Sequence, residues 1–227
     1  MKINADFDKR VLVHSETLDW IPSPMAGVSR RPLDRVGGEV ARATSIVRYD
    51  PGSKFPPHVH GGGEEFIVLD GVFQDEHGDF PAGSYVRNPP TSRHTPASAP
   101  GCVIFVKLWQ FDPEDRTAVT LDINALQGPD ARLHKDAREE VSVRTCAPGA
   151  EIAIDTPGGA ELLVLEGAMT ESGDALEKHS WLRTPVGGAI RGAAGPDGVR
   201  FWLKTGHLAG VEAELERVAG ASSGITA

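Results

Sequence analysis

GSKFPPHVHGGGEEFIVLDG, residues 52–71, places histidines, glycines and glutamates directly ahead of a short apolar run. On a strand, which has a side-chain period of two, His58 and His60 project from the same face, so both imidazoles can reach one ion. The three glycines at 61–63 let the chain turn without side-chain clashes and bring Glu64 back toward the histidine pair. The stretch therefore predicts a strand, a tight turn and a second strand that together carry a metal site.

A fourth candidate ligand, His94, follows the turn-forming run PPTSR at 89–93 and has to return from elsewhere in the sheet. Glu65 competes with Glu64 for the role of the carboxylate ligand: the spacing to Gly71 favours Glu64, whereas strand alternation alone does not decide. Imidazole and carboxylate ligands suit transition metals better than calcium or magnesium. We expect one divalent transition metal per chain, with zinc, iron, manganese and nickel as the candidates, and no organic cofactor. The remaining histidines are expected to be solvated or structural: His14, His77, His134, His179 and His207.

The same pattern returns 96 or 97 residues later, which indicates duplication of one all-β unit. ELLVLEG at 161–167 echoes EFIVLDG at 65–71, and FWLK at 201–204 echoes IFVK at 104–107. The second copy lacks the metal-binding residues. At the offsets of 96 and 97 residues, none of the three histidines aligns with another histidine. The aligned residues are Ile154 or Asp155 for His58, Thr156 or Pro157 for His60, and Ile190 or Arg191 for His94. Only Glu161 lies near the position that corresponds to the glutamate.

Short β-rich runs and frequent turn residues predict an antiparallel sandwich or jelly roll, with a hairpin over 70–80. We expect a metal-binding domain over 1–120, a second domain without metal ligands over 121–210, and a short helix or flexible tail over 211–227. Trp181 and Trp202 are expected to be core or interface aromatics.

Composition limits the range of partners. The chain has 227 residues, 40% of them hydrophobic, which is enough to bury a sizeable core. A net charge of −9 argues against nucleic acid as a partner, and no apolar stretch is long enough for a membrane span. The acidic N-terminus shows no export signal, so we expect a cytoplasmic protein whose two cysteines, Cys102 and Cys146, are reduced.

The motif Gly-x5-His-x-His-x3-Glu-x6-Gly, from Gly52 to Gly71, resembles the first cupin motif, and Gly78–Ser84 leading to His94 resembles the second. More narrowly, about residues 15–110 resemble the cupin domain of ChrR-type anti-sigma factors. The segments that carry this resemblance are WIPSP at 20–24, RATSIVRY at 42–49, GGEE at 62–65, GVFQDE at 71–76, PAGSY at 81–85 and FVK at 105–107.

This resemblance implies a double-stranded β-helix, present here twice, and a metal, usually zinc, held by His58, His60, Glu64 and His94. ChrR-type proteins carry a helical zinc-binding domain ahead of the cupin that grips the sigma factor. This sequence enters the cupin pattern almost at once, so we expect the sensory half without the sigma-binding domain.

Two functions are compatible with these features. The first is a sensory module in which zinc with four protein ligands forms a closed site and a regulatory protein is the partner, with a homodimer as a further possibility. The second is a mononuclear iron-dependent dioxygenase acting on a small β-diketone or related carbonyl compound. Its substrate would enter the N-terminal barrel, with Phe66, Tyr85 and Phe105 as candidate lining residues. The identity of the metal decides between the two classes.

Overall fold

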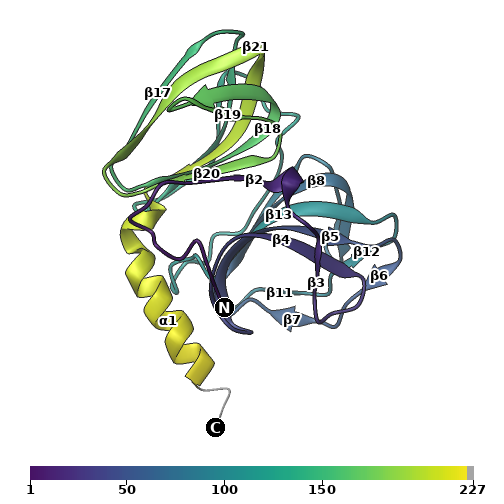
Figure 1. Cartoon of the computed structure of the whole chain (residues 1–227). Helices are drawn as coiled ribbons and strands as arrows, with labels where there is room; N and C mark the ends of the chain where they lie inside the picture. Colours follow the sequence, from purple (N-terminus) through teal and green to yellow (C-terminus); the bar gives the residue numbers. More distant parts are fainter. Residues whose placement is uncertain (224–227) are drawn as a thin grey trace. The chain divides into compact units, whose positions relative to one another are not determined.

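The computed structural model describes residues 1–223, and this part of the chain forms two compact units (Figure 1). The first unit contains residues 1–5, 19–125 and the chain from 213 on. The second unit contains residues 6–18 and 126–212. The expected tail falls partly on residues 224–227, which lie outside the described residues.

The units differ from the expected division because each takes in one terminal segment. Residues 6–18, expected in the first domain, join the second unit, where β2 (Val11–His14) pairs with β20 (Ser180–Thr184). The helix α1 (Val211–Ser223) forms where a helix was expected, and from residue 213 it belongs to the first unit. Its Glu214 accepts a hydrogen bond of 2.6 Å from Nε of buried Arg42, so a charged contact fastens the helix there.

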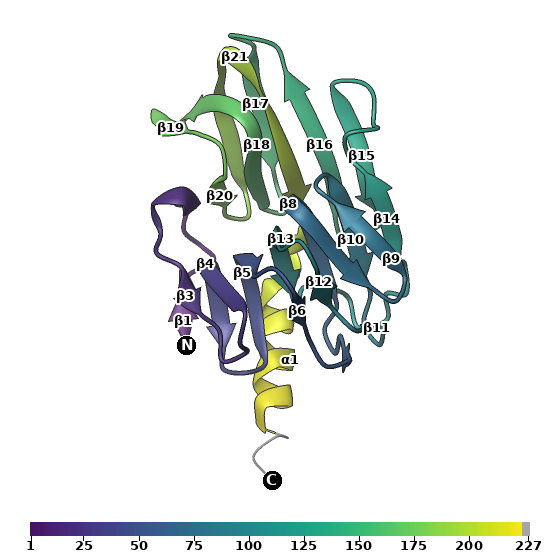
Figure 2. The same cartoon turned by 90° about the vertical axis from the view of Figure 1, so that its right-hand side faces the viewer.

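Antiparallel strands build the first unit around a central order β5-β13-β8-β10, with shorter strands closing the barrel. Its strands are β1 (Lys2–Ile3), β3 (Ile21–Pro22), β4 (Val28–Gly37), β5 (Ala41–Tyr49), β6 (Ser53–Lys54), β7 (His58–Val59), β8 (Glu64–Asp75), β9 (Gly78–Pro81), β10 (Ser84–Asn88), β11 (Arg93–His94), β12 (Ala97–Ser98), β13 (Cys102–Leu108) and β14 (Val119–Asp122). β8 and β9 form the predicted hairpin, in which Asp75 pairs with Gly78 (Figure 2).

Alternation along β8 decides which side chains enter the core of the first unit. Phe66 and Val68 face inward, where they pack with Ile104 and Val106 of the neighbouring β13. Aromatic and β-branched side chains fit this pleated, half-buried surface, so the apolar run of the motif becomes the centre of a sheet. The remaining buried members of this core are Phe73, Phe80, Val86 and Cys102.

The second unit repeats this plan with the central order β16-β21-β18-β20. Its elements are β2, the short 3₁₀ helix η1 (Ser15–Thr17), β15 (Asp130–Lys135), β16 (Glu140–Cys146), β17 (Glu151–Thr156), β18 (Ala160–Glu171), β19 (Asp174–Leu176), β20, β21 (Gly188–Thr205) and the 3₁₀ helix η2 (His207–Gly210), which leads into α1. Both units are therefore all-β jelly rolls of one type, as the internal repeat predicted.

No helix in the described residues is both long and apolar enough to cross a membrane.

Candidate metal centre

His58 and His94 lie directly opposite one another on two short antiparallel strands, β7 and β11 (Figure 1). Residues opposite each other in such a pair point to the same face, so both imidazoles are presented together. His60, two residues after His58, keeps the same facing, and its backbone N–H donates to the carbonyl of Ser92 at 2.9 Å. The strand pairing therefore explains how a histidine 34 residues beyond His60 returns to it.

The turn formed by the three glycines at 61–63 determines the direction in which the chain enters β8. Gly63 has a φ of +78°, and a Cβ there would lie 2.4 Å from the ring of Phe111. Only glycine meets both demands, because the left-handed region disfavours a side chain and the aromatic ring fills the space that one would need. The chain then enters β8 with Glu64 facing the histidines.

Strand alternation separates the two glutamates that sequence alone left open. Glu64 lies in the histidine group, whereas Glu65 faces the other side of β8 and accepts a hydrogen bond of 2.6 Å from the hydroxyl of Tyr85. Glu65 therefore belongs to a different buried cluster.

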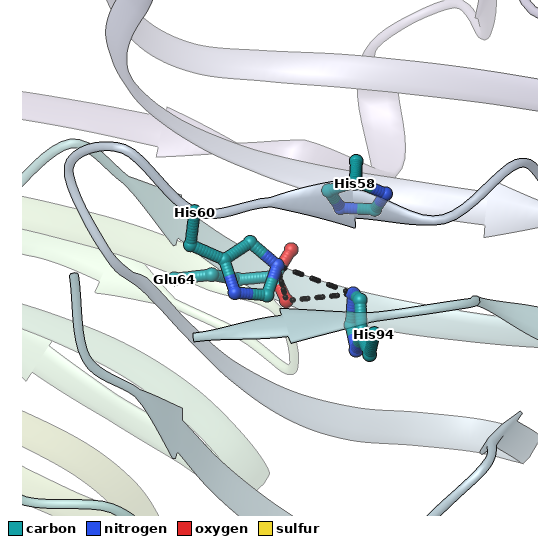
Figure 3. Close-up of side chains that lie close together, drawn as sticks. All are labelled: His58, His60, Glu64 and His94. Atoms are coloured by element: carbon teal, nitrogen blue, oxygen red, sulfur yellow. Dashed lines mark hydrogen bonds and ion pairs between the residues drawn. The ribbon is translucent and has the colours of Figure 1, made fainter. Parts of the chain in front are cut away.

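His58, His60, Glu64 and His94 gather around one space (Figure 3), with one ligand-type atom of each lying within 4.8 Å of the others. Nε2 of His60 lies 3.2 Å from Nε2 of His94, and these two atoms lie 3.4 and 3.5 Å from Oε2 of Glu64. The ring of His58 is centred 5.0 Å from that of His60 and 4.9 Å from that of His94. Three of the side chains are buried and His58 is exposed.

Neighbouring side chains determine which nitrogens of the buried histidines carry protons. Ser92 donates its hydroxyl proton to the carbonyl of Pro89 at 2.6 Å, so at 2.9 Å it accepts from Nδ1 of His60. Nδ1 of His94 lies 3.1 Å from a carboxylate oxygen of Asp75 and donates to it. In the neutral rings both Nε2 atoms then carry lone pairs. Two lone pairs therefore face each other across 3.2 Å without a proton between them.

Burial shifts the pKa of these groups in the directions expected for desolvated ligands. It lowers the pKa of His60 to about 3, with the charges of His94 and His58 adding to the effect. The pKa of His94 is also lowered, first by burial and then by His58, while Asp75 opposes the shift. The pKa of Glu64 is raised to about 7 by burial, against the hydrogen bond from Asn88.

A transition-metal cation fits this set. Among residues 1–223, no lysine or arginine lies within 4.0 Å of the Glu64 carboxylate, so its buried negative charge lacks a cationic side chain. Ligands at about 2.0–2.2 Å from one metal ion lie about 3.0–3.5 Å from each other, in agreement with the separations among His60, Glu64 and His94. The facing lone pairs and the unbalanced carboxylate both favour a bound cation. Ser92 and Asp75 would hold the rings in position, as outer partners do in metal sites.

A cavity of about 330 Å³ opens beside the centre within the first unit, lined by His58, His60 and Glu64. Its wall is mainly apolar and comes from the inward positions of β4, β5 and β13. The candidate lining residues are not among those that border it. Phe66 is packed in the core, and Tyr85 and Phe105 point to the other face of the sheet, because each stands one residue out of phase with the inward positions.

The second unit has apolar or small side chains where the first has the four candidate ligands. Ile154 pairs with Ile190 as His58 pairs with His94, so the strand register selects the offset of 96 residues. The residues that replace His58, His60, Glu64 and His94 are Ile154, Thr156, Ala160 and Ile190. Apolar side chains fill the interior around these positions.

Glu161 corresponds to Glu65, as the alignment of residues 161–167 with 65–71 indicates, and not to the candidate ligand Glu64. Glu65 pairs with Arg87 and Lys107 on its neighbouring strands, and Glu161 pairs with Arg183 and Lys204 in the same register. Each unit therefore keeps a buried charged group on the face of the sheet away from the barrel interior. Sequence reasoning missed this group, although its members recur at the repeat offset and could have been found there.

The other histidines lie outside the centre. His77 is exposed in the β8–β9 turn, and the rest hydrogen-bond to polar side chains in the second unit: His14 to Ser180, His134 to Asp136, His179 to Glu16 and His207 to Glu161. Cys102 and Cys146 are free thiols, as expected.

Comparison with known proteins agrees with the fold and with the sequence resemblance. Residues 8–112 match the family described as the ChrR cupin-like domain. No curated protein matches the sequence.

Among similar solved structures is a protein of Nostoc punctiforme PCC 73102 described as a candidate dioxygenase, with 17% identity over 89% of this chain and 84% of that chain, at a TM-score of 0.71. The pirin YhhW of Escherichia coli, solved in complex with nickel(II), is 15% identical over 87% of this chain and 99% of its own, at 0.65. A salicylate 1,2-dioxygenase from Pseudaminobacter salicylatoxidans is 12% identical over 76% and 73%, at 0.56. The chain therefore has the cupin fold, and residues 8–112 match the ChrR cupin-like domain.

Proposed function

We propose that His58, His60, Glu64 and His94 bind one divalent transition metal and that this centre oxidises a small organic molecule with dioxygen. The observation that carries the proposal is the cavity of about 330 Å³, which three of the four residues line. A structural zinc site is normally closed by its protein ligands, whereas a catalytic site leaves a position that a small molecule can reach. The bordering cavity favours the second arrangement.

The residues of the chain supply the geometry for such chemistry. Glu64 contributes the negative charge, and Ser92 and Asp75 keep the Nε2 lone pairs of His60 and His94 aimed at one point. The apolar wall limits water around a bound molecule. When bound, a redox-active metal would supply Lewis acidity and reactivity toward dioxygen.

Two of the similar structures are described as dioxygenases, and a third was solved with nickel(II). At sequence identities of 12–17% the similarity shows only a shared fold, so these structures support the proposed function by analogy. The analogy points to a bound metal and to oxidation by dioxygen, and it names no substrate for this chain. A small β-diketone or related carbonyl compound remains the substrate class that we propose first.

Metal analysis followed by oxygen uptake tests the proposal. Protein purified without added metal is analysed for zinc, iron, manganese, nickel and copper, loaded with iron(II), and supplied with acetylacetone and related diketones. We expect about one metal per chain and oxygen consumption that depends on both iron and substrate. Loss of both in the His94→Ala variant would support the assigned centre. Full metal occupancy in the His58→Ala and His94→Ala variants would overturn it.

A second candidate, a ChrR-like sensory module in a cytoplasmic regulator, is favoured by the family match over residues 8–112. In this function zinc binding would alter the contact with a regulatory protein partner. One zinc per chain without turnover, together with capture of a sigma factor encoded nearby, would favour the module. Turnover with iron and no capture would favour the enzyme.

A further inference from the structure

The cavity beside the metal centre has a second chemically distinct wall, formed by two arginines of β4. Arg30 stands opposite Val47 of β5, on the inward face. A bulge between Pro32 and Asp34 then shifts the alternation by one residue, so that Arg35 also borders the cavity. An extra residue in one strand has this effect because it moves every later side chain to the other face. The bulge thus directs two guanidinium groups into one space.

Neutral oxygens are the hydrogen-bond acceptors of these arginines in the described part of the chain. Arg30 donates to the hydroxyl of Ser23, and Arg35 donates to the carbonyl of Gly38. Glu39 borders the same cavity, but it is exposed and forms no ion pair with either arginine within residues 1–223. The pKa of Arg35 is lowered first by burial and then by the charge of Arg30. Two like charges, partly removed from water, therefore destabilise each other and would be relieved by an anion.

Apolar side chains next to Arg30 line the same cavity. Val28, Val47 and Ile104 line it on three neighbouring strands. Exposed apolar residues border the cavity as well: Met25 is 44% exposed and Val59 is 63% exposed. An amphiphilic ligand matches this surface, because its apolar body would be desolvated against the aliphatic wall.

Tyr49 borders the same cavity as the arginines and the metal centre. Its ring packs edge-on against Phe55 with the centroids 5.2 Å apart, and it lines the cavity. The pKa of its hydroxyl is raised chiefly by burial and also by the charge of Glu64, whereas Arg30 lowers it. Because the two arginines, Tyr49 and three residues of the metal centre border one cavity of about 330 Å³, one small molecule can contact both groups.

We propose that Arg30 and Arg35 form an anion-binding wall that selects a small organic carboxylate with an apolar body. The carboxylate lies at the guanidinium groups, the body packs along Val28 and Val47, and the opposite end approaches the four metal-binding residues. The placement of that opposite end rests on the proposed function. The preference for negative charge does not, because the arginines carry it whether or not a metal is bound.

Titration of the full chain with charged and neutral probes of equal size tests this wall. The probes are benzoate and hexanoate, each paired with its neutral amide, and binding is measured by calorimetry on metal-loaded and chelator-treated protein. We expect each carboxylate to bind at least about tenfold more tightly than its amide in both preparations, since charge-assisted hydrogen bonds exceed neutral ones by this order.

Substitution of the arginines supplies the decisive comparison. Arg30→Gln and Arg35→Gln are expected to weaken carboxylate binding by about 10- to 100-fold and to leave amide binding and metal content unchanged. Arg31→Gln is the matched control, because Arg31 faces the other side of β4 and lies over the ring of Trp20 at 4.3 Å. Equal affinities for acid and amide, or unchanged carboxylate binding in both inward variants, would overturn the proposal. So would an equal loss in the control variant.

These outcomes are separable from failure of the proposed function. If the chain binds no metal but still binds carboxylates more tightly than amides in a manner that depends on Arg30, the anion-binding wall is supported and the metal centre is excluded. If the chain binds metal but binds acid and amide probes equally, the metal centre is supported and the anion-binding wall is excluded.

Discussion

Glu64 and Glu65 are consecutive residues of β8 with opposite environments. The carboxylate of Glu64 lies 3.4 Å from His60 and 3.5 Å from His94, whereas Glu65 accepts a hydrogen bond from Tyr85 at 2.6 Å on the other face of the sheet. Both are buried, at 8% and 2% exposure. One step along a strand thus separates a candidate ligand from a structural anion.

The two glutamates should respond differently to the same substitution. Glu64→Gln removes the charge at the metal centre, so metal content after dialysis should fall well below that of the unaltered protein. Glu65→Gln should keep the metal but reduce the free energy of unfolding by about 1–3 kcal/mol, because it weakens a buried charged hydrogen bond. Elemental analysis and denaturant unfolding measure the two effects. Metal loss in the second variant alone would reverse the assignment.

Ser92 should tune metal affinity without binding the metal. Ser92→Ala removes the acceptor for Nδ1 of His60, and loss of such an outer partner typically weakens metal binding by about 10- to 100-fold. Ser98→Ala is the control, since that buried hydroxyl donates to the carbonyl of Val72 at 2.7 Å instead. Competition with a chelating dye measures the affinities. Similar affinities in the two variants would contradict the orienting role.

Metal should stabilise the folded chain through the histidines of the first unit. A ligand at about 100 times its dissociation constant adds about 2.7 kcal/mol to folding, so saturating zinc should raise the unfolding midpoint of the first unit. His94→Ala should abolish the increase. His179→Asn should retain it, because this residue hydrogen-bonds to Glu16 in the second unit and its φ of 63° suits asparagine. A zinc response that survives His94→Ala would exclude His94 as a ligand.

Gly63 should be far less tolerant of a side chain than Gly52, although both adopt positive φ, +78° and +80°. Alanine at either position incurs the left-handed penalty of about 1–2 kcal/mol. Only Gly63→Ala also meets the ring of Phe111, whereas nothing lies within 4 Å of a Cβ at Gly52. The Gly63 variant should therefore unfold at lower denaturant and bind less metal. Equal stabilities would show that the Phe111 contact relaxes freely.

Cys102 should react slowly with iodoacetamide at neutral pH. Burial raises the pKa of its thiol to about 11, against an opposing hydrogen bond with Ser98. Since the thiolate is the nucleophile, the rate in folded Cys146→Ser protein should rise about tenfold per pH unit from 8 to 10 and still be rising at pH 11. In denaturant the rate should level off near the ordinary thiol pKa. A plateau near pH 9 in the folded protein would be inconsistent with this shift.

The repeat, the jelly-roll class, the β8–β9 hairpin and the helix near the C-terminus could all be predicted from local pattern, because short-range alternation and turn residues encode them. The arginine wall of the cavity could not be predicted in this way. Arg30 and Arg35 are five residues apart, so in a regular strand their side chains would point to opposite faces of the sheet. The bulge between Pro32 and Asp34 places them on the same face. Membership of residues 6–18 in the second unit was equally inaccessible, since it depends on pairing with β20, which lies far along the chain. The Glu64–Glu65 choice needed the register of β8.

The contribution of α1 to the first unit has a consequence for folding during synthesis. The first unit draws on residues 1–5 and 19–125 but also on α1, whose Glu214 and Arg217 bond to Arg42 and to the carbonyl of Phe111. Phe111 is the ring that fills the space beside Gly63, so a segment 106 residues further along the chain contacts the support of the turn that leads to Glu64. The nascent barrel therefore leaves the ribosome incomplete and reaches its final form only after residues 214–217 have emerged.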